Sequence, residues 1–373
     1  MVKLNKVMRK ILRILLFLVL VCGCSKKDNE INQTPVSNFY FPEINSEEWD
    51  ATLPEELSWN STAIDDLNGF LEQNNTRAFI VLKEGKIVLE NYWGNDDQET
   101  AVFNKNSSWP WYSAGKTLTA FLVGIAQENG LLSIEDSSSN FLGSGWTSLS
   151  DNQEIAIKIK HQLTMTTGLD YHVDDLNCTE PNCLIYRNAP GTQWFYHNAS
   201  YSLLKEVIEN ASQTTYNIFS NQSVESKIGM SGNWIESNYN MTYLSSARDM
   251  ARFGLLVLNR GIWKEEVILN DTDYFSMMTN TSQTLNESYG YLWWLNGKNS
   301  LIPPGFTIPV GRSLTPNAPD DMIAGLGKDG QYLDIVPSQD LVIIRMGGAP
   351  EDSEVSNGFH DEMWRYINEV IDE

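Results

Sequence analysis

The spacing of apolar and polar residues predicts strands near both ends of the chain and helices between them. Near the start, the segment STAIDDLNGFLEQN (residues 61–74) has apolar residues about 3.6 positions apart and predicts a helix capped by its serine or threonine. It is followed by AFIVLKEGKIVLENYWG (78–94), where two runs rich in β-branched residues flank Glu84-Gly85-Lys86. Such a pattern is typical of a β-hairpin.

The C-terminal part of the chain returns to strands. The segments YGYLWWLNG (289–297) and GQYLDIVPSQDLVIIRMGG (330–348) are aromatic and β-branched, and Pro337-Ser338 supplies a turn within the second. The last segment, NGFHDEMWRYINEVID (357–372), has helical spacing. We expect strands from the two chain ends to combine into one antiparallel sheet, with the terminal helices on one face.

The middle of the chain, about residues 117–279, is predicted to be mostly helical and to form a sub-domain on the other side of the sheet. Its clearest helix is TYLSSARDMARFGLLVLNRGIW (242–263), which is amphipathic and is ended by Gly261. The sequence therefore predicts an α+β fold, with residues 51–373 as one domain. A cleft between the sheet and the helical sub-domain is a natural place for a ligand.

The first residues have the composition of a secretory signal, since five basic residues precede the short apolar run ILLFLVLV. The following VCGC resembles a bacterial lipobox and implies cleavage before Cys24, with lipid on its thiol. The alternative is ordinary signal cleavage nearby, without lipid. We therefore expect residues 1–23 to be a lipoprotein signal peptide and residues 24–50 to be a flexible tether. The protein would then be held at a membrane of the bacterial cell envelope.

The chain is strongly acidic, with a formal net charge of −22. Removal of residues 1–23, which contain five basic residues and no acidic one, would change this charge to −27. A chain of this charge repels nucleic acid and anionic lipid headgroups, so we expect neither as a partner. The simplest interpretation is solubility in an envelope or extracellular setting.

Two further cysteines, Cys178 and Cys183, lie in the short polar segment NCTEPNC. In an oxidising compartment such a pair most simply forms a disulfide across one loop. A metal site is the alternative, but it needs more ligands, and the nearby His172 does not complete a tetrahedral set. The sequence thus predicts a disulfide and no metal.

Ser113 and Lys116 form an S-x-x-K pair at the start of an almost wholly apolar helix in WPWYSAGKTLTAFLVGIAQENG. Residues three apart share a helix face, so the hydroxyl and the amine can meet. A serine needs a base to become a nucleophile, and burial favours the neutral amine of lysine. The spacing alone is weak evidence, because Ser202 and Lys205 repeat it.

A second segment, APGTQWFYHNASYSLL (189–204), strengthens the catalytic interpretation. With Tyr196-His197-Asn198 in this segment, the chain resembles the serine β-lactamase-related superfamily, which includes class C β-lactamases, D-Ala-D-Ala carboxypeptidases, esterases and 6-aminohexanoate-dimer hydrolases. That family has S-x-x-K, then Tyr-x-Asn, then a strand motif that contains glycine. Further similar segments follow the family's order, namely HQLTMTTGLD, SSARDMARFG and GQYLDIVPSQDLVIIR.

The resemblance implies a β-lactamase/transpeptidase-like fold and a role for each matching residue. Ser113 would form an acyl-enzyme, with Lys116 and Tyr196 sharing the work of the base. Asn198 would hold Lys116 or the substrate by hydrogen bonds. One oxyanion donor would be the backbone N–H of Ser113, and the other would come from the strand near Ala324, Gly325 and Gly327. No cofactor is implied.

The chain departs from the family at the third motif. Where β-lactamases have Lys-Thr-Gly and many relatives have His-x-Gly, this chain has DMIAGLGKDGQ, with Lys328 past the expected position. That cation grips a substrate carboxylate, so its absence favours an esterase or amidase acting on a small ester or amide. One alternative is a peptidoglycan D,D-peptidase or β-lactamase. Another is a non-catalytic surface-binding protein on the same fold, although a chain without catalysis has no chemical reason to keep Ser113, Lys116 and Tyr196.

Overall fold

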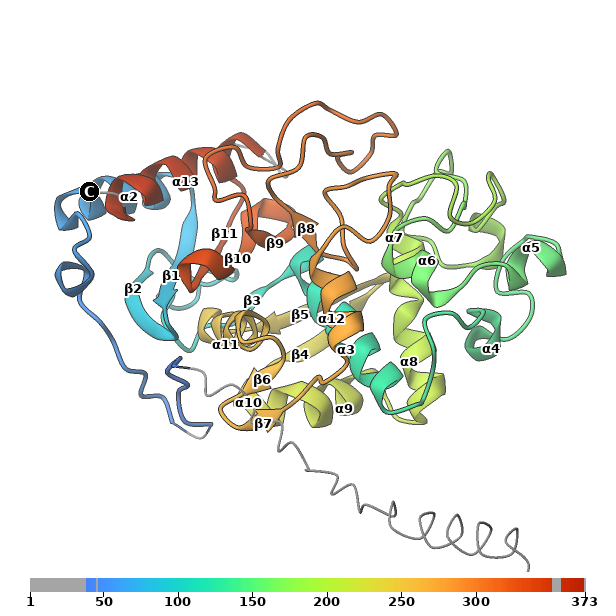
Figure 1. Ribbon diagram of the computed structural model, residues 1–373, viewed down its shortest axis with the longest axis horizontal. Helices are drawn as coiled ribbons and strands as arrows, with labels where there is room; N and C mark the ends of the chain where they lie inside the picture. Colours follow the sequence, from blue (N-terminus) through green and yellow to red (C-terminus); the bar gives the residue numbers. More distant parts are fainter. Residues whose placement is uncertain (1–37, 45, 351–356, 372–373) are drawn as a thin grey trace, which may run out of the picture. The chain divides into compact units, whose positions relative to one another are not determined.

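A computed structural model of the chain describes residues 38–371, except residue 45 and residues 351–356. Its centre is a six-stranded antiparallel sheet that combines strands from both ends of the chain (Figure 1). The strand order is β2-β1-β11-β10-β9-β8, so a C-terminal strand pairs with an N-terminal one. The six strands are β1 (Thr76–Lys83), β2 (Lys86–Tyr92), β8 (Trp294–Leu295), β9 (Ile323–Gly327), β10 (Gln331–Val336) and β11 (Leu341–Gly347).

Helices cover both faces of this sheet. On one face, α2 (Ile64–Gln73) and α13 (Asn357–Ile371) lie side by side, and on the other face α11 (Ala247–Leu258) crosses β1, β10 and β11. The glycine at position 254 brings α11 close to the sheet, because a Cβ atom there would lie 2.5 Å from Val342 Cγ1. The side chains of β10 and β11 are buried along their whole length, as expected for central strands covered on both sides.

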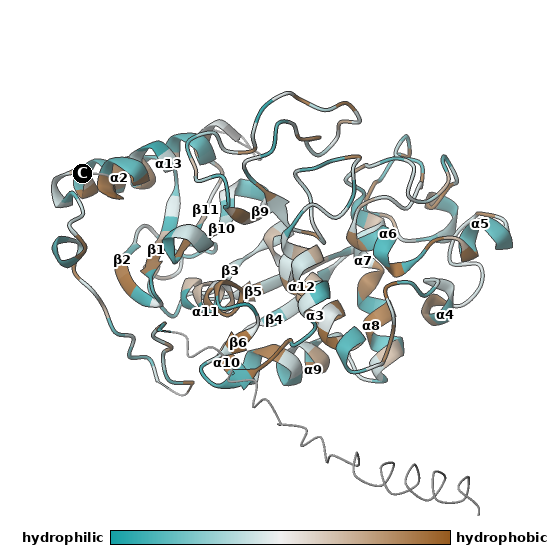
Figure 2. Cartoon of the chain, viewed as in Figure 1, coloured by the Kyte–Doolittle hydropathy of each residue, from teal (hydrophilic) through white to brown (hydrophobic). Residues whose placement is uncertain are grey.

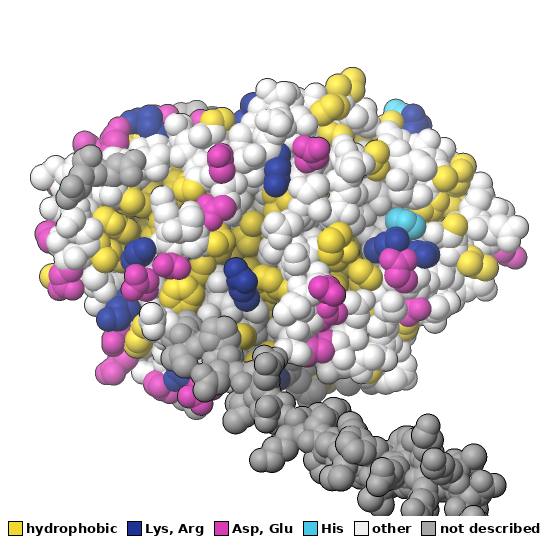
Figure 3. All heavy atoms as spheres, viewed as in Figure 1, with side chains coloured by type: hydrophobic (Ala, Val, Ile, Leu, Met, Phe, Trp, Pro, Cys, Tyr) yellow, Lys and Arg dark blue, Asp and Glu magenta, His cyan; other side chains and the backbone are white. Residues whose placement is uncertain are grey.

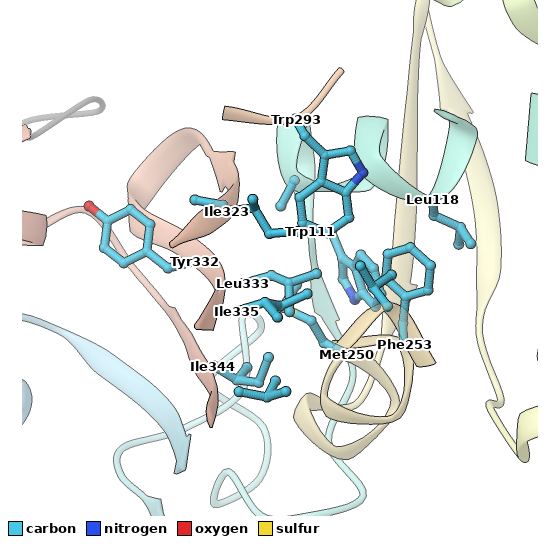
Figure 4. Close-up of a cluster of buried hydrophobic side chains, with 14 of the residues drawn as sticks. Trp111, Leu118, Met250, Phe253, Trp293, Ile323, Tyr332, Leu333, Ile335 and Ile344 are labelled. Carbon is cyan, nitrogen blue, oxygen red and sulfur yellow. The ribbon is translucent and has the colours of Figure 1, made fainter. Parts of the chain in front are cut away.

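The hydrophobic core fills the space between the sheet and α11 and continues toward the helical part of the molecule. Figure 4 shows Met250 of α11 beside Leu333 and Ile335 of β10, and Phe253 of α11 beside Trp111. Large aromatic side chains, including the fully buried Trp111, extend this core. On the helices at the periphery, such as α2 and α8, hydrophobic and hydrophilic residues alternate around the axis (Figure 2). Burial of apolar surface therefore holds the central sheet and the helical part of the molecule together.

The remaining helices lie mostly to one side of the sheet. They are α3 (Lys116–Glu128), α4 (Ser139–Leu142), α5 (Asp151–Ile155), α6 (Ile159–Leu163), α7 (Asn198–Ser202), α8 (Leu204–Ser212), α9 (Tyr216–Ser220), α10 (Ser226–Ile228) and α12 (Thr272–Thr279). Two small sheets accompany them, made of β3 (Trp109–Pro110), β5 (Asn240–Ser245) and β4 (Asn233–Ser237), and of β6 (Ile262–Trp263) and β7 (Glu266–Val267). The 3-10 turn η3 (Tyr112–Gly115) joins β3 to α3.

The structure confirms the predicted α+β fold, with one antiparallel sheet built from both chain ends. The hairpin is also present, with Glu84 and Gly85 at positive φ in its turn. Three local predictions were wrong. Asn60, and no serine or threonine, accepts the hydrogen bond from Thr62 N–H at the start of the first helical segment.

The other two corrections concern a segment predicted as helix that is a strand, and a predicted strand that is mostly a turn. Residues 242–245 belong to strand β5, and the helix after them begins only at Ala247, where Ser246 and Asp249 form a capping box. Of the aromatic segment 289–297, only Trp294–Leu295 is a strand, because the chain turns back on itself before it. Both errors arose where a turn or cap interrupts a continuous apolar pattern.

The predicted signal peptide, the lipid site at Cys24 and most of the predicted tether lie outside the described residues. Within the described ranges, no helix is both long enough and apolar enough to cross a membrane.

Candidate active site

The turn that carries Ser113 is fixed by the buried side chain of Trp111. The backbone N–H of Trp111 donates to Tyr243 O at 2.9 Å, and its indole N–H donates to Ser245 Oγ at 2.9 Å. Both acceptors belong to β5, so the segment before the serine is attached to the small three-stranded sheet. Tyr112 then takes a positive φ of 48°, a conformation that bulky residues rarely adopt. Ser113 follows in the 3-10 turn that leads into α3.

Lys116 lies beside Ser113, as the spacing predicts. Its Nζ donates a hydrogen bond to Ser113 Oγ at 2.9 Å, while the lysine is only 4% exposed. Its ammonium position lies over the rings of Tyr196 and Tyr201, at 4.9 Å and 4.3 Å from their centroids. Burial lowers the pKa of Lys116 to about 7 because the charged form loses hydration. A substantial fraction of Lys116 side chains is therefore uncharged at neutral pH.

Tyr196 also reaches Ser113, from a different part of the chain. Burial raises the pKa of Tyr196 to about 12, and a hydrogen bond with the Ser113 side chain opposes this rise. The structure thus brings the three predicted residues Ser113, Lys116 and Tyr196 together around one hydroxyl oxygen. Because a phenol of this pKa holds its proton at neutral pH, Tyr196 is an acid in the resting site and Lys116 is the group that can accept a proton.

Aromatic side chains surround Tyr196 and fix its ring. Trp294 is stacked on it, with centroids 6.0 Å apart and an interplanar angle of 18°. Trp194 and Tyr289 lie at centroid distances of 6.4 Å each. From the sequence alone, Trp194 and Trp294 could line an apolar acyl or leaving-group pocket or belong to the core, since aromatic residues dominate core packing.

Asn198 is not bonded to Lys116 in this structure. Its Nδ2 donates instead to Asn177 Oδ1 at 2.9 Å, and its Oδ1 is buried without a hydrogen-bond partner among the described residues. Asn177 immediately precedes Cys178, which forms the predicted disulfide with Cys183. The disulfide loop is therefore attached directly to the Tyr-x-Asn segment.

The strand β9 passes close to the serine turn, and two of its glycines make this approach possible. A Cβ atom at Gly327 would lie 2.4 Å from Trp111 O, and one at Gly325 would lie 3.1 Å from Thr117 Cγ2. Ala324 lies on the opposite face of β9, because successive residues of a strand alternate. The structure therefore places Gly325 and Gly327, and not the side chain of Ala324, against the segment that carries Ser113.

Charged residues lie around the exposed edge of this turn. Tyr112 has a raised pKa, chiefly through burial, with Asp329 and Asp97 raising it further and Lys328 lowering it. Lys328, which follows β9 instead of lying within it, therefore acts electrostatically on the Tyr112 phenol. The electrostatic effect of Asp97 on the Tyr112 phenol could not be predicted from its position in the sequence.

The second S-x-x-K pair has no comparable geometry. Ser202 donates its hydroxyl to Asn198 O at 3.0 Å, while Lys205 forms ion pairs with Glu236 at 2.9 Å and Glu209 at 3.9 Å. The two side chains thus have separate partners. Lys205 is therefore held by two carboxylates and not by the serine of its own pair. His197 is buried beside the site, with Nε2 at 3.3 Å from Asp170 O.

Comparisons with known proteins agree with this fold. The Beta-lactamase family model matches residues 70–357. A solved structure from Bacillus anthracis, described as a 6-aminohexanoate-dimer hydrolase, has a TM-score of 0.63 at 18% identity, covering 88% of this chain and 89% of that one. A penicillin-binding protein homologue from Caulobacter crescentus has a TM-score of 0.63 at 12% identity, covering 82% and 96%.

A third solved structure is EstCE1, a hydrolase with promiscuous acyltransferase activity, with a TM-score of 0.62 at 14% identity, covering 84% of this chain and 99% of that one. Comparison with curated proteins gives no match. At these identities the solved structures establish a shared fold, while the family model spans most of the sequence. The chain therefore belongs to the Beta-lactamase family of hydrolases.

Proposed function

We propose that this protein is a serine hydrolase that forms an acyl-enzyme on Ser113, and that it acts as an esterase or amidase. The observation that carries the proposal is the 2.9 Å hydrogen bond between Lys116 Nζ and Ser113 Oγ, made by a lysine that is buried. A neutral amine at this distance can accept the hydroxyl proton as the oxygen attacks a carbonyl carbon.

The remaining steps use the other groups around the serine. Backbone N–H groups of Ser113 and of β9 stabilise the negative oxygen of the tetrahedral intermediate. Tyr196, which keeps its proton at neutral pH, donates it to the leaving alkoxide or amine as the carbonyl reforms. The proton on Lys116 then passes to Tyr196, which restores both groups. Water attacks the ester carbon of the acyl-enzyme while Lys116 accepts a proton from it. As the carbonyl reforms, the bond to Ser113 Oγ breaks, Lys116 returns that proton to the oxygen, and the acid product leaves.

The experiment that tests this proposal is covalent labelling with a fluorescent fluorophosphonate. The wild-type protein should be labelled at one site, and Ser113→Ala should lose the label completely. Ser202→Ala is the matched control, because it removes the serine of the second S-x-x-K pair and should keep the label. Equal labelling of Ser113→Ala and the wild type would show that the nucleophile is another residue.

The substrate class is proposed from the third motif. Because β9 itself carries no cation where the family has one, we expect substrates without a carboxylate next to the scissile bond. Rapid turnover of short p-nitrophenyl esters without labelling by fluorescent penicillin supports the esterase. Failure to hydrolyse any uncharged ester or amide would exclude it.

A D,D-peptidase or β-lactamase remains a second candidate because of one observation. Lys328, just after β9, lowers the pKa of Tyr112, the residue before Ser113, and is therefore a candidate cation for a substrate carboxylate. Turnover of nitrocefin, lost in Lys328→Gln, would favour this candidate over the esterase.

We also propose that Cys24 is lipidated and holds the protein at the cell envelope. The support is the arrangement of basic residues, apolar run and cysteine in the sequence. Metabolic labelling with a fatty acid should mark the wild type and not Cys24→Ser. Labelling of both would contradict the assignment.

A further inference from the structure

A cavity whose lining does not include Ser113 lies between the C-terminal end of α11, helix α12 and the strands β8, β9 and β10. Its volume is about 600 Å³, within the range of small-molecule sites. Hydrophobic side chains gather on this face of the molecule between α11 and α12, with a basic side chain among them (Figure 3). None of the residues assigned to the hydrolytic chemistry lines this cavity.

The cavity is lined by the polar residues Thr272, Ser276, Thr279, Asn280 and Asn296 and by apolar side chains from distant parts of the chain. The apolar side chains include Leu258, Leu269, Phe275, Leu295, Met322 and Ile335. All of these except Phe275 are less than a tenth exposed, so rigid elements of the fold hold the walls. A preformed, partly apolar cavity of this size favours a ligand with a hydrocarbon body.

The mouth of the cavity carries two basic side chains, Arg260 and Lys298. In the part of the chain that the structure describes, neither one forms an ion pair. The chain has 48 acidic and 26 basic residues, so two unpaired cations beside one apolar cavity are a local exception to its negative charge. Such cations attract an anionic group at the end of an apolar body.

Two carboxylates, Asp320 and Asp321, also line the mouth and affect the binding of an anion there. Both oxygens of Asp321 accept hydrogen bonds from Ser338, at 2.7 Å from its backbone N and 2.8 Å from its Oγ. Asp321 is therefore committed to the turn after β10. Asp320 is exposed and repels an anion weakly through water. Removal of its charge should therefore strengthen the binding of an anionic ligand.

The cavity is separate from the serine site but shares a strand with it. Ile323 lines the cavity, and Gly325, two residues later on the same face of β9, contacts the helix that follows Ser113. Residues two apart on a strand are separated by about 6.5 Å. A ligand in the cavity would thus lie beside the strand that serves the hydrolytic site without entering that site.

We infer that this cavity binds an aliphatic monocarboxylate, with the hydrocarbon chain against the apolar walls and the carboxylate at Arg260 and Lys298. The inference does not depend on the proposed hydrolytic function. It concerns a binding site with different residues, and it is measured by binding alone.

The test is calorimetric titration of the full chain with dodecanoate in buffer without detergent. We expect one saturable site, with roughly ten-fold weaker binding of dodecanol, because the alcohol cannot form the charge-assisted hydrogen bonds. Arg260→Gln and Lys298→Gln should each weaken dodecanoate binding by roughly ten-fold and leave dodecanol binding unchanged.

Three further variants locate the binding site and test the sign of the charge on the ligand. Ser276→Trp, which places a large ring into the cavity from an exposed position of α12, should abolish binding while the thermal unfolding temperature is retained. Asp320→Asn should strengthen binding of the anion. Ser113→Ala should bind dodecanoate as the wild type does.

Several results would overturn the inference. They are the absence of saturable binding, equal affinity for the acid and the alcohol, weaker binding in Asp320→Asn, or loss of binding in Ser113→Ala. The last result would place dodecanoate in the hydrolytic site. None of these measurements requires turnover, so failure of the hydrolase proposal and failure of this one are distinguishable.

Discussion

The ring of Trp294 stacks on the ring of Tyr196, with their planes 18° apart, although the two residues are almost a hundred positions apart in the sequence. Trp294 belongs to β8, the edge strand of the large sheet, and Tyr196 lies just before α7. The orientation of the phenol therefore depends on the sheet.

Replacement of Trp294 should disturb the reaction more than the fold. In Trp294→Ala, we expect kcat for an ester substrate to fall by about ten- to a hundred-fold, because the phenol loses its fixed position. Trp294→Phe should recover most of the rate, since a smaller ring still stacks. Steady-state kinetics of both variants measure this, and an unchanged kcat in Trp294→Ala would separate Trp294 from catalysis.

The rate should depend on the protonation of Lys116. Since burial lowers its pKa to about 7, the neutral amine that accepts a proton increases as the pH rises through about 7. We expect kcat/KM to rise over this range and to level off above it, until Tyr196 loses its proton near its raised pKa of about 12. A pH–rate profile that is flat between pH 5 and 9 would argue against Lys116 as the base.

Lys116 should also lower the free energy of unfolding, and this effect should change with pH. Its folded-state pKa is below the ordinary value of about 10.4, so between about pH 7 and 10.4 the unfolded chain binds the additional proton. Stability should therefore rise with pH in this window, by about 1.4 kcal/mol per unit for this group. Lys116→Met should be inactive and more stable than the wild type at pH 7. Its stability should lack the rise with pH that Lys116 causes. Urea unfolding at several pH values tests it, and a Lys116→Met variant less stable than the wild type would contradict it.

The close contact between α11 and the sheet predicts a specific pair of substitutions. In Gly254→Ala, the new methyl group would lie 2.5 Å from Val342 Cγ1, and we expect a loss of about 1–3 kcal/mol in the free energy of unfolding. Adding Val342→Ala removes the contacted atom and should recover part of that loss. If the double variant is as unstable as the sum of the two single ones, the contact is not the cause.

The attachment of the disulfide loop to Asn198 predicts that Asn177 positions the site. Asn177→Ala removes the acceptor of the 2.9 Å hydrogen bond, which leaves the Asn198 side chain free to rotate. We expect kcat to fall by about ten-fold with KM little changed, and Asn177→Asp, which keeps the acceptor, to recover the rate. Reduction of the Cys178–Cys183 disulfide with a dithiol should act in the same direction. A change confined to the unfolding temperature would indicate a purely structural role.

The sequence predicts those features that depend on local spacing. Ser113 and Lys116 are three residues apart at a helix start, so their contact follows from helix geometry alone. The burial that lowers the pKa of Lys116 also follows from its apolar surroundings. The strands β1, β2, β10 and β11 have strong β-branched patterns and are found where expected.

The features that could not be predicted depend on long-range packing. Trp294 reaches Tyr196 only because β8 lies at the edge of the folded sheet, and Asn198 turns to Asn177 only because a distant loop passes beside it. Strand β5 is an intermediate case. Its residues alternate between half-buried and buried, a period of two that was obscured by the amphipathic helix that follows it.

The pairing of β1 with β11 has a consequence for the time at which the protein becomes active. During synthesis, β11 is made after the other five strands of the sheet, and until it inserts between β1 and β10 both of those strands have an unpaired edge. The glycine strand β9, which lies against the nucleophile turn, pairs with β8 and β10, and β10 gains its second neighbour only when β11 inserts. A hydrolase built in this order completes its central sheet only when β11 has been made, and its many pairings between distant segments predict slow folding.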